Sequence, residues 1–230
     1  MNITDLFIAR VIFFPAIGVS FFCGLYGVYY FIQGVHKIYE FKTDRKLFSF
    51  LCIISAVTDA ISLMMYYKFI TLPSQYYFFP ISMYGLLQHI VICMLYSFWL
   101  SPMERKYAYI NAFAAIPLWS LPKIFGFENF SKMDLISGPI SHLLLFCASV
   151  HFLGNLNNRT TTQLKNDPLY QIARVNIIYF GVMMITFMLM SYDIVFLYYS
   201  PLMSIIQDVC YMYAIYRFTQ RTNFEIHDWL

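Results

Sequence analysis

Four ionisable side chains lie deep inside apolar stretches of this sequence, where such groups are costly. They are Asp59, His89, His142 and Asp208. Counting about ten residues inward from the ends of each apolar stretch puts all four near the middle of a bilayer. An ionisable group at that depth needs a cavity or a polar partner, because hydrocarbon does not solvate its charge. The sequence therefore predicts an inward-facing polar site built from four helices.

Helical spacing extends these positions into polar stripes, because residues at i, i+3/4 and i+7 share one face of a helix. The members of these stripes are Ser55, Asp59, Ser62 and Tyr66; Ser82, Gly85, His89, Cys93 and Tyr96, with Gln88 beside the histidine; and Ser200, Ser204, Asp208 and Tyr211. A weaker line is formed by Tyr179, Met183, Thr186, Met190 and Asp193, the last near the outer mouth of the bundle.

Two interpretations of these stripes stay open. In the first, Asp59, Gln88, His89, His142 and Asp208 bind a ligand or carry protons, and the hydroxyl groups and Asp193 support them. In the second, the same groups hydrogen-bond to one another across helices and only stabilise the bundle.

Several specific chemistries find little support in the sequence. A retinal-binding pump needs a lysine in its last span, and residues 199–218 contain none. A haem site would rest on His89 and His142 alone, which is a weak signal. The sequence has no HExxH motif, no Cys/His cluster with metal-ligand spacing, and no Gly-x-Gly-Asp or Gly-x-Ser-Gly protease motif. We therefore predict no catalytic residue, no cofactor and no metal, and we keep a lipid-directed enzyme as the lesser alternative.

Seven apolar stretches must position these side chains. They span residues 10–33, 47–70, 77–100, 107–126, 133–154, 173–197 and 199–218. Each is about 20 residues long, which is what a helix needs to cross the hydrocarbon core. The chain is 60% hydrophobic and 12% charged, far from the soluble norm of roughly a quarter charged. The sequence predicts an all-α, single-domain bundle of seven transmembrane helices over residues 1–230.

Basic residues between the spans predict the orientation of the bundle. One face carries eleven of them: Lys37, Lys42, Arg45, Lys46, Arg105, Lys106, Arg159, Lys165, Arg174, Arg217 and Arg221. The other carries four: Arg10, Lys68, Lys123 and Lys132. Because Lys and Arg are retained on the cytoplasmic side, the N-terminus is expected outside and the C-terminus in the cytosol. The basic rim favours anionic membrane lipid, and nothing indicates nucleic-acid binding.

One segment resembles a known group of proteins. The run Asn166-Asp167-Pro168-Leu169-Tyr170, followed by Ile177-Ile178-Tyr179-Phe180, is similar to small bacterial seven-span membrane proteins of unassigned role, some akin to the membrane input modules of sensor kinases. The likeness covers the last 65 residues or so. It implies a sensor-like bundle in a bacterial inner membrane. A sensor kinase continues into a coiled segment and catalytic domains, whereas this sequence stops at Leu230.

Two functions are compatible with these observations. The first is an integral membrane sensor or receptor-like signalling component, which binds a small or lipidic ligand in the polar cavity and passes the change to a cytosolic or membrane partner. The second is a proton-coupled transporter or channel that uses the midplane Asp and His residues.

Overall fold

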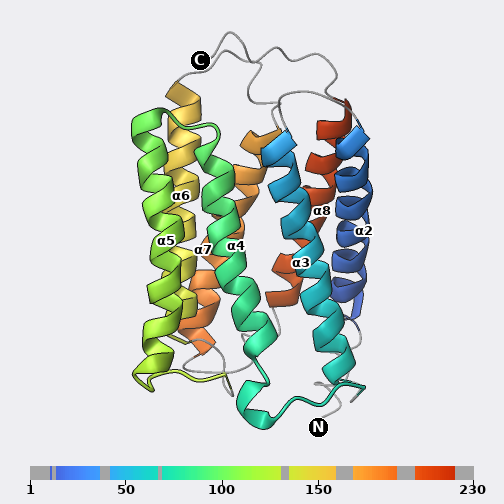
Figure 1. The fold of residues 1–230 in the computed structure, drawn as a ribbon, viewed down its shortest axis with the longest axis vertical. Helices are drawn as coiled ribbons and strands as arrows, with labels where there is room; N and C mark the ends of the chain where they lie inside the picture. The colour runs from blue at the N-terminus through green and yellow to red at the C-terminus, as the bar shows by residue number, and fades with distance from the viewer. Residues whose placement is uncertain are drawn as a thin grey trace.

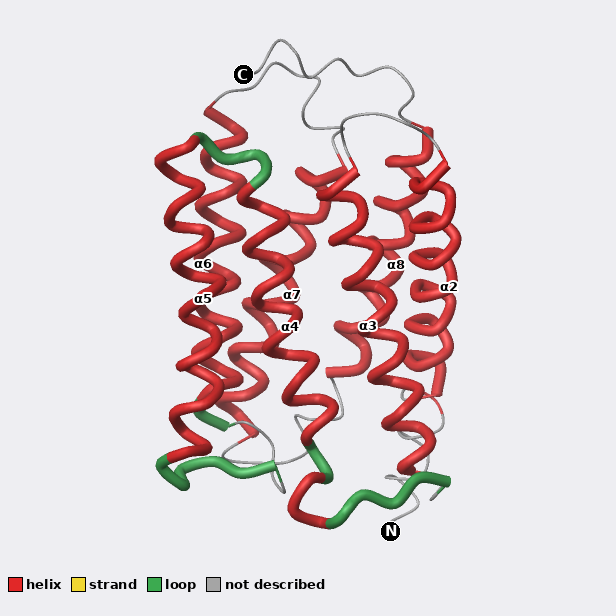
Figure 2. Tube along the Cα trace, viewed as in Figure 1, coloured by secondary structure: helices red, strands yellow, loops and turns green. Residues whose placement is uncertain are grey.

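The computed structural model describes residues 11, 14–36, 42–66, 69–130, 135–158, 168–190 and 200–220. In this part of the chain the structure is all-helical, with connecting loops and no strand (Figure 2). The predicted all-α class is therefore confirmed. The long helices, shown in Figure 1, are α2 (Phe14–His36), α3 (Lys42–Tyr66), α4 (Phe79–Ser97), α5 (Pro102–Ile124), α6 (Ser137–Asn158), α7 (Pro168–Met190) and α8 (Ser200–Gln220), and a short 3-10 helix covers Ser74–Tyr76.

The seven long helices form a closed bundle with neighbours that follow chain order (Figure 1). Each helix packs on the next along the chain for most of the circuit, and α8 returns to pack on α2, so the first and last helices lie side by side. Helix α2 covers the pair α3 and α8, which also contact each other, and α5 covers the pair α4 and α6 in the same way. The other five helices, α3, α4, α6, α7 and α8, therefore surround the central axis.

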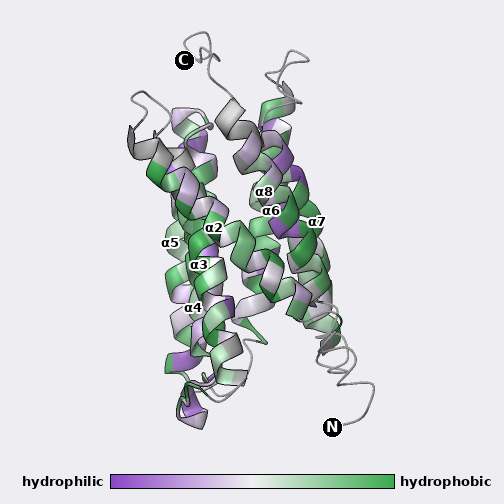
Figure 3. Ribbon diagram, turned by 90° about the vertical axis from the view of Figure 1, so that its right-hand side faces the viewer, coloured by the Kyte–Doolittle hydropathy of each residue, from purple (hydrophilic) through white to green (hydrophobic). Residues whose placement is uncertain are grey.

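Four helical segments are long and apolar enough to cross a membrane. They are Phe14–Ile32, Ser74–Ser97, Ser137–Leu156 and Tyr170–Leu189. Their apolar side chains also face outward, as in Phe21 and Phe22 of α2, which are exposed. Apolar residues predominate along the helices in Figure 3. An outward apolar surface is what a lipid environment requires, so the chain has the character of a membrane protein.

The predicted spans each overlap one observed helix, and the differences have local causes. Helix α3 ends at Tyr66 rather than near residue 70, and residues 71–73 are non-helical ahead of the short 3-10 helix. Helix α7 begins at Pro168, before the predicted start at 173. Proline suits the first turn of a helix, where its missing N–H has no partner to lose. Hydropathy detects only the apolar part of a helix, so the polar first turn of α7 was not included.

Close packing of α2 on α3 depends on two glycines. A Cβ atom at Gly24 would collide with the Cβ of Ala56, and one at Gly27 would lie 3.0 Å from the carbonyl oxygen of Ser49. Small residues let two helix backbones approach closely, which is a main source of helix association in membranes. Helices α2 and α3 therefore form a tight antiparallel pair.

Candidate functional site

Asp59 of α3 and Asp208 of α8 lie close enough for their charges to interact. Both carboxylates also interact with one hydroxyl, that of Ser20 on α2. The Ser20 Oγ atom lies 3.4 Å from the Oγ atom of Ser55 on α3. Asp208 and Ser20 are buried, and Asp59 is half-buried. The junction of α2, α3 and α8 therefore places two carboxylates around a shared hydrogen-bonding group.

The two carboxylates have no cationic partner in the part of the chain that the structure describes. No Lys or Arg is among the groups that act on either one. Two like charges close together in a low-dielectric setting repel strongly, so the pair is stabilised by a bound proton or by a cationic group between them. The arrangement can therefore bind a proton or a cationic group.

Two tyrosines complete this group from the other side of the bundle. Tyr84 of α4 hydrogen-bonds with Ser55, and Tyr179 of α7 hydrogen-bonds with Ser204. Each of the two tyrosines also lies near both carboxylates. We refer to this set as the acidic cluster, and its members are Ser20, Ser55, Asp59, Tyr84, Tyr179, Ser204 and Asp208. It draws on α2, α3, α4, α7 and α8.

A second set of polar side chains joins α4, α6, α7 and α8. The Tyr96 hydroxyl lies 2.9 Å from the Ser149 hydroxyl and accepts a hydrogen bond of 2.9 Å from Asn176 Nδ2. The Oδ1 atom of Asn176 accepts from the Tyr211 hydroxyl at 2.7 Å and from Gln207 Nε2 at 3.2 Å. Gln207 Nε2 also donates to the Tyr211 hydroxyl at 2.9 Å. We call these five residues the amide network, and all five are buried.

Tyr211 connects the amide network to the acidic cluster. Its hydroxyl belongs to the network, and its surroundings include Tyr84 and Tyr179 of the acidic cluster. Asp208 lies on the same helix, one turn before Tyr211. Polar side chains therefore continue from the carboxylate pair to Tyr96, near the end of α4 that is predicted to face the cytosol.

The two histidines lie apart from the carboxylates. His89 is held between α5 and α6, with its Nδ1 atom 2.6 Å from the Ser141 hydroxyl and its Nε2 atom 3.2 Å from Asn111 Oδ1. His142 bonds through Nδ1 to the Gly138 carbonyl oxygen at 2.8 Å, in its own helix. Its ring packs on Phe187 at a centroid separation of 5.1 Å. The four ionisable residues that the sequence places at one depth thus form two pairs in the structure.

Gln88 differs from its neighbours because one of its polar atoms has no partner. The side chain is 2% exposed, and its Nε2 atom makes no hydrogen bond. At about 100° per residue, Gln88 points about 40° from Tyr84 and about 80° from Tyr96, on the arc of α4 between them. Those two tyrosines reach the acidic cluster and the amide network respectively, so Gln88 lies between the two sets.

The other predicted residues have simpler surroundings. Ser62 donates to the carbonyl oxygen of Thr58 on its own helix at 2.9 Å. Tyr66 is the last residue of α3, and its side chain, like the whole of Asp193, lies outside the described residues. Five residues that the sequence interpretation did not include belong to the two polar sets: Ser20, Tyr84, Ser149, Asn176 and Gln207. Of these, Asn176 and Gln207 were detectable as amides inside apolar stretches.

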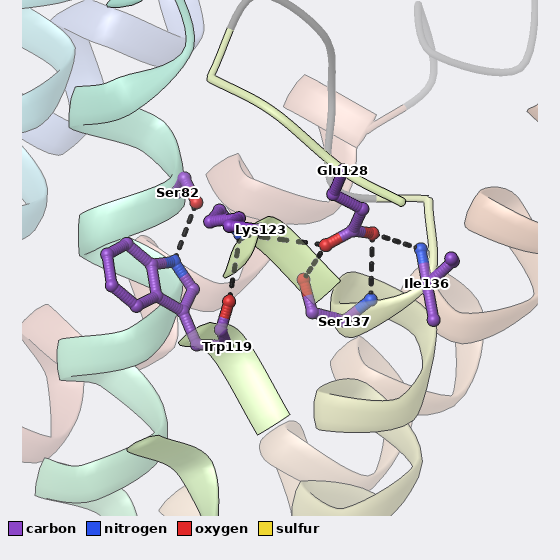
Figure 4. Close-up of polar contacts among 6 residues, drawn as sticks. All are labelled: Ser82, Trp119, Lys123, Glu128, Ile136 and Ser137. Carbon is purple, nitrogen blue, oxygen red and sulfur yellow. Dashed lines mark hydrogen bonds and ion pairs between the residues drawn. The ribbon is translucent and has the colours of Figure 1, made fainter. Parts of the chain in front are cut away.

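A separate polar group lies at the far end of α5 and is shown in Figure 4. The Glu128 carboxylate accepts hydrogen bonds from the backbone N–H groups of Ile136 and Ser137 and, at 2.7 Å, from the Ser137 hydroxyl. Lys123 Nζ lies 3.6 Å from the same carboxylate. Ser137 is the first residue of α6, so Glu128 caps that helix.

Lys123 links this cap to α4. Its Nζ atom donates to the Trp119 carbonyl oxygen at 3.2 Å and lies 4.8 Å from the centre of the Trp119 ring. The indole N–H of Trp119 donates to the Ser82 hydroxyl of α4 at 2.7 Å (Figure 4). Charges and donors in this group are matched to one another, which is typical of a structural contact.

Among the described residues, no group of three or more His, Cys, Asp or Glu side chains is placed to hold a metal ion. The chain matches no known protein-family model, no curated protein and no solved structure. The resemblance to sensor input modules therefore stays a prediction. The acidic cluster, with its two carboxyl groups and no cationic partner among the described residues, is the candidate functional site.

Proposed function

We propose that this chain is a seven-span integral membrane protein that acts as a receptor-like sensor. A small or lipidic ligand binds at the acidic cluster, and the resulting shift of helices passes to a cytosolic or membrane partner. The N-terminus lies outside and the C-terminus in the cytosol, and the bacterial inner membrane is the expected location.

One observation carries this proposal: Asp59 and Asp208 share the Ser20 hydroxyl, and no described Lys or Arg acts on either carboxyl group. A ligand that neutralises the pair removes a repulsion between α3 and α8, so binding changes the preferred separation of these helices. Asp208 shares its helix with Gln207 and Tyr211 of the amide network. A shift of α8 therefore reaches α4, α6 and α7 through hydrogen bonds that are already made.

The orientation rests on the charge asymmetry and is tested by labelling. Met103 lies in the first turn of α5 and Phe127 follows the helix, and the two residues are 71% and 74% exposed, at opposite ends of the helix. In intact cells a membrane-impermeant maleimide should modify Phe127→Cys and leave Met103→Cys unmodified until the cells are broken. The reverse pattern contradicts the proposed orientation, and labelling of both contradicts the span count.

The sensing role is tested by ligand-induced stabilisation. The purified chain in lipid nanodiscs is screened against small molecules and lipids for compounds that raise its unfolding temperature. A true ligand should lose its effect in Asp59→Asn and in Asp208→Asn, and should keep it in Ser62→Ala, whose hydroxyl bonds only within α3. Absence of any stabilising compound, or stabilisation that persists in both Asn variants, refutes the sensing site.

A proton-coupled transporter is the second candidate, and the continuity of polar groups from Asp59 to Tyr96 favours it. Paired carboxylates exchange protons readily, hydroxyl groups can relay them, and the amides can hold those hydroxyl groups in position. This function predicts proton flux into liposomes that is lost in both Asn variants. The sensor predicts no flux in the native chain, so one assay separates the two.

A further inference from the structure

We propose that the ligand of the acidic cluster is a small amphipathic molecule with a protonated amine at one end and a hydrogen-bond acceptor at the other. Asp59 and Asp208 bind the amine, and Gln88 Nε2 donates to the acceptor. This inference rests on the proposed function and narrows it to one class of ligand.

The amine end follows from the chemistry around Ser20. An ammonium group has three N–H donors and one positive charge. Asp59, Asp208 and the Ser20 hydroxyl offer three accepting groups at one junction, and no described Lys or Arg competes for them. A cation between two carboxylates also relieves their mutual repulsion. Each N–H of the ammonium can therefore donate to a different group, and its charge offsets one of the two carboxylates.

Aromatic side chains beside the carboxylates favour the same kind of group. Tyr84 and Tyr179 both lie near Asp59 and Asp208. The faces of aromatic rings attract organic cations, most strongly where water is excluded. An ammonium on a short carbon chain therefore suits these surroundings.

The acceptor end follows from Gln88. Its amide nitrogen is buried and has no hydrogen-bond partner, and leaving such a donor unsatisfied costs free energy. Gln88 lies one helical turn, about 6 Å, from Tyr84 along α4, in the direction of Tyr96. It is therefore offset from the amine position along the axis of the bundle. A hydroxyl, ether or carbonyl oxygen on the ligand would accept from it.

A metal cation fits this combination less well. It binds oxygen ligands at the carboxylates but offers nothing to Gln88 Nε2, which is a donor. A ligand with both a donor end and an acceptor end serves the two carboxyl groups and Gln88 Nε2 at once. The two sets of groups therefore point to an organic amine rather than to an ion.

Three probes of the same shape test the proposal on the full chain in nanodiscs. They are tyramine, which has both ends, phenethylamine, which lacks the hydroxyl, and 4-ethylphenol, which lacks the amine. Equilibrium dialysis should rank tyramine first, phenethylamine about tenfold weaker, and 4-ethylphenol without saturable binding.

Two variants assign the ends separately. Asp208→Asn should lower the affinities for tyramine and for phenethylamine alike, by about tenfold or more. Gln88→Leu should lower the affinity for tyramine to that for phenethylamine and leave the affinity for phenethylamine unchanged. Ser62→Ala is the matched control, and the unfolding temperature of each variant shows that it is folded.

Three outcomes overturn the proposal. The first is equal binding of 4-ethylphenol and tyramine, and the second is no saturable binding of either amine to folded protein. The third is an unfolding temperature that NaCl raises more than KCl does, without amine binding. In each case a stabilising compound from the ligand screen would leave the sensing role intact. Failure of that screen as a whole overturns the proposed function instead.

Discussion

Asp59 and Asp208 both interact with the Ser20 hydroxyl at the junction of α2, α3 and α8, and they lie close enough for their charges to act on each other. The two residues lie far apart in the sequence, on α3 and α8, which contact each other directly. Two carboxyl groups so close together in a helical bundle lower its stability whenever both are ionised, and four consequences of this architecture can be measured.

Neutralising either carboxylate should stabilise the folded chain. In Asp208→Asn and Asp59→Asn the repulsion within the pair is removed, so each variant should unfold at a higher temperature in nanodiscs. The double variant should gain less than the sum of the two, with an interaction of about 1 kcal/mol, because the repulsion can be removed only once. Strictly additive effects would mean that the two charges do not interact.

Breaking the amide network should destabilise the bundle in proportion to the bonds lost. Asn176→Leu leaves Gln207, Tyr211 and Tyr96 without their shared partner and should cost about 3 kcal/mol. Tyr96→Phe removes one hydroxyl and keeps the ring stacked on Phe152, so it should cost about 1 kcal/mol. Denaturant titration measures both, and equal losses would contradict the central place of Asn176.

The Glu128 cap of α6 should contribute more to the free energy of unfolding than the capping box at the start of α5. Glu128 is buried, accepts three hydrogen bonds and pairs with Lys123, so Glu128→Gln should cost about 2 kcal/mol. Glu104 completes a capping box with Ser101 and is only half-buried, so Glu104→Gln should cost about 0.5 kcal/mol. The free energies of unfolding of the two variants, measured under the same conditions, show which substitution costs more stability.

Helix α2 should tolerate a methyl group at one glycine and not at another. Gly24→Ala forces the new Cβ against Ala56, which must separate α2 from α3. Gly18→Ala places its Cβ where no other atom lies within 4 Å. We expect Gly24→Ala to lower the unfolding temperature by several degrees, consistent with a loss of about 1–2 kcal/mol, and Gly18→Ala to change it little. A similar loss in both variants would contradict the packing argument, because alanine has a higher helix propensity than glycine and propensity alone would stabilise both.

The sequence predicts the helices well because their apolar stretches are long and separated by polar segments. In the part of the chain that the structure describes, a long helix overlaps each predicted span, and four helical segments are long and apolar enough to cross a membrane. Hydropathy places the apolar span from residue 173, whereas the Asp167-Pro168 pair predicts a helix start at Pro168, and α7 does begin at Pro168.

The candidate site is only partly predictable from the sequence. The position of a residue along its helix gives its depth in the bundle, but it does not give the direction in which the helix turns the side chain. The sequence puts Asp59, His89, His142 and Asp208 at one level, and the structure turns the histidines toward α5, α6 and α7 and the carboxylates toward α2. Ser20 could not be identified in advance, since a serine in a membrane helix is common. Its importance comes from two neighbours that are remote in sequence.

Tight packing of α2 on α3 through Gly24 also bears on how the chain enters the membrane. In the proposed seven-span topology, Asp59 emerges during synthesis long before Asp208, so α3 would insert before its partner helix exists. Helix α2 precedes α3, and it brings the Ser20 hydroxyl to the Asp59 carboxyl group. On that topology the α2–α3 hairpin would enter the bilayer as one unit, with the Asp59 carboxyl group already hydrogen-bonded within the protein, and α8 would pack on it later.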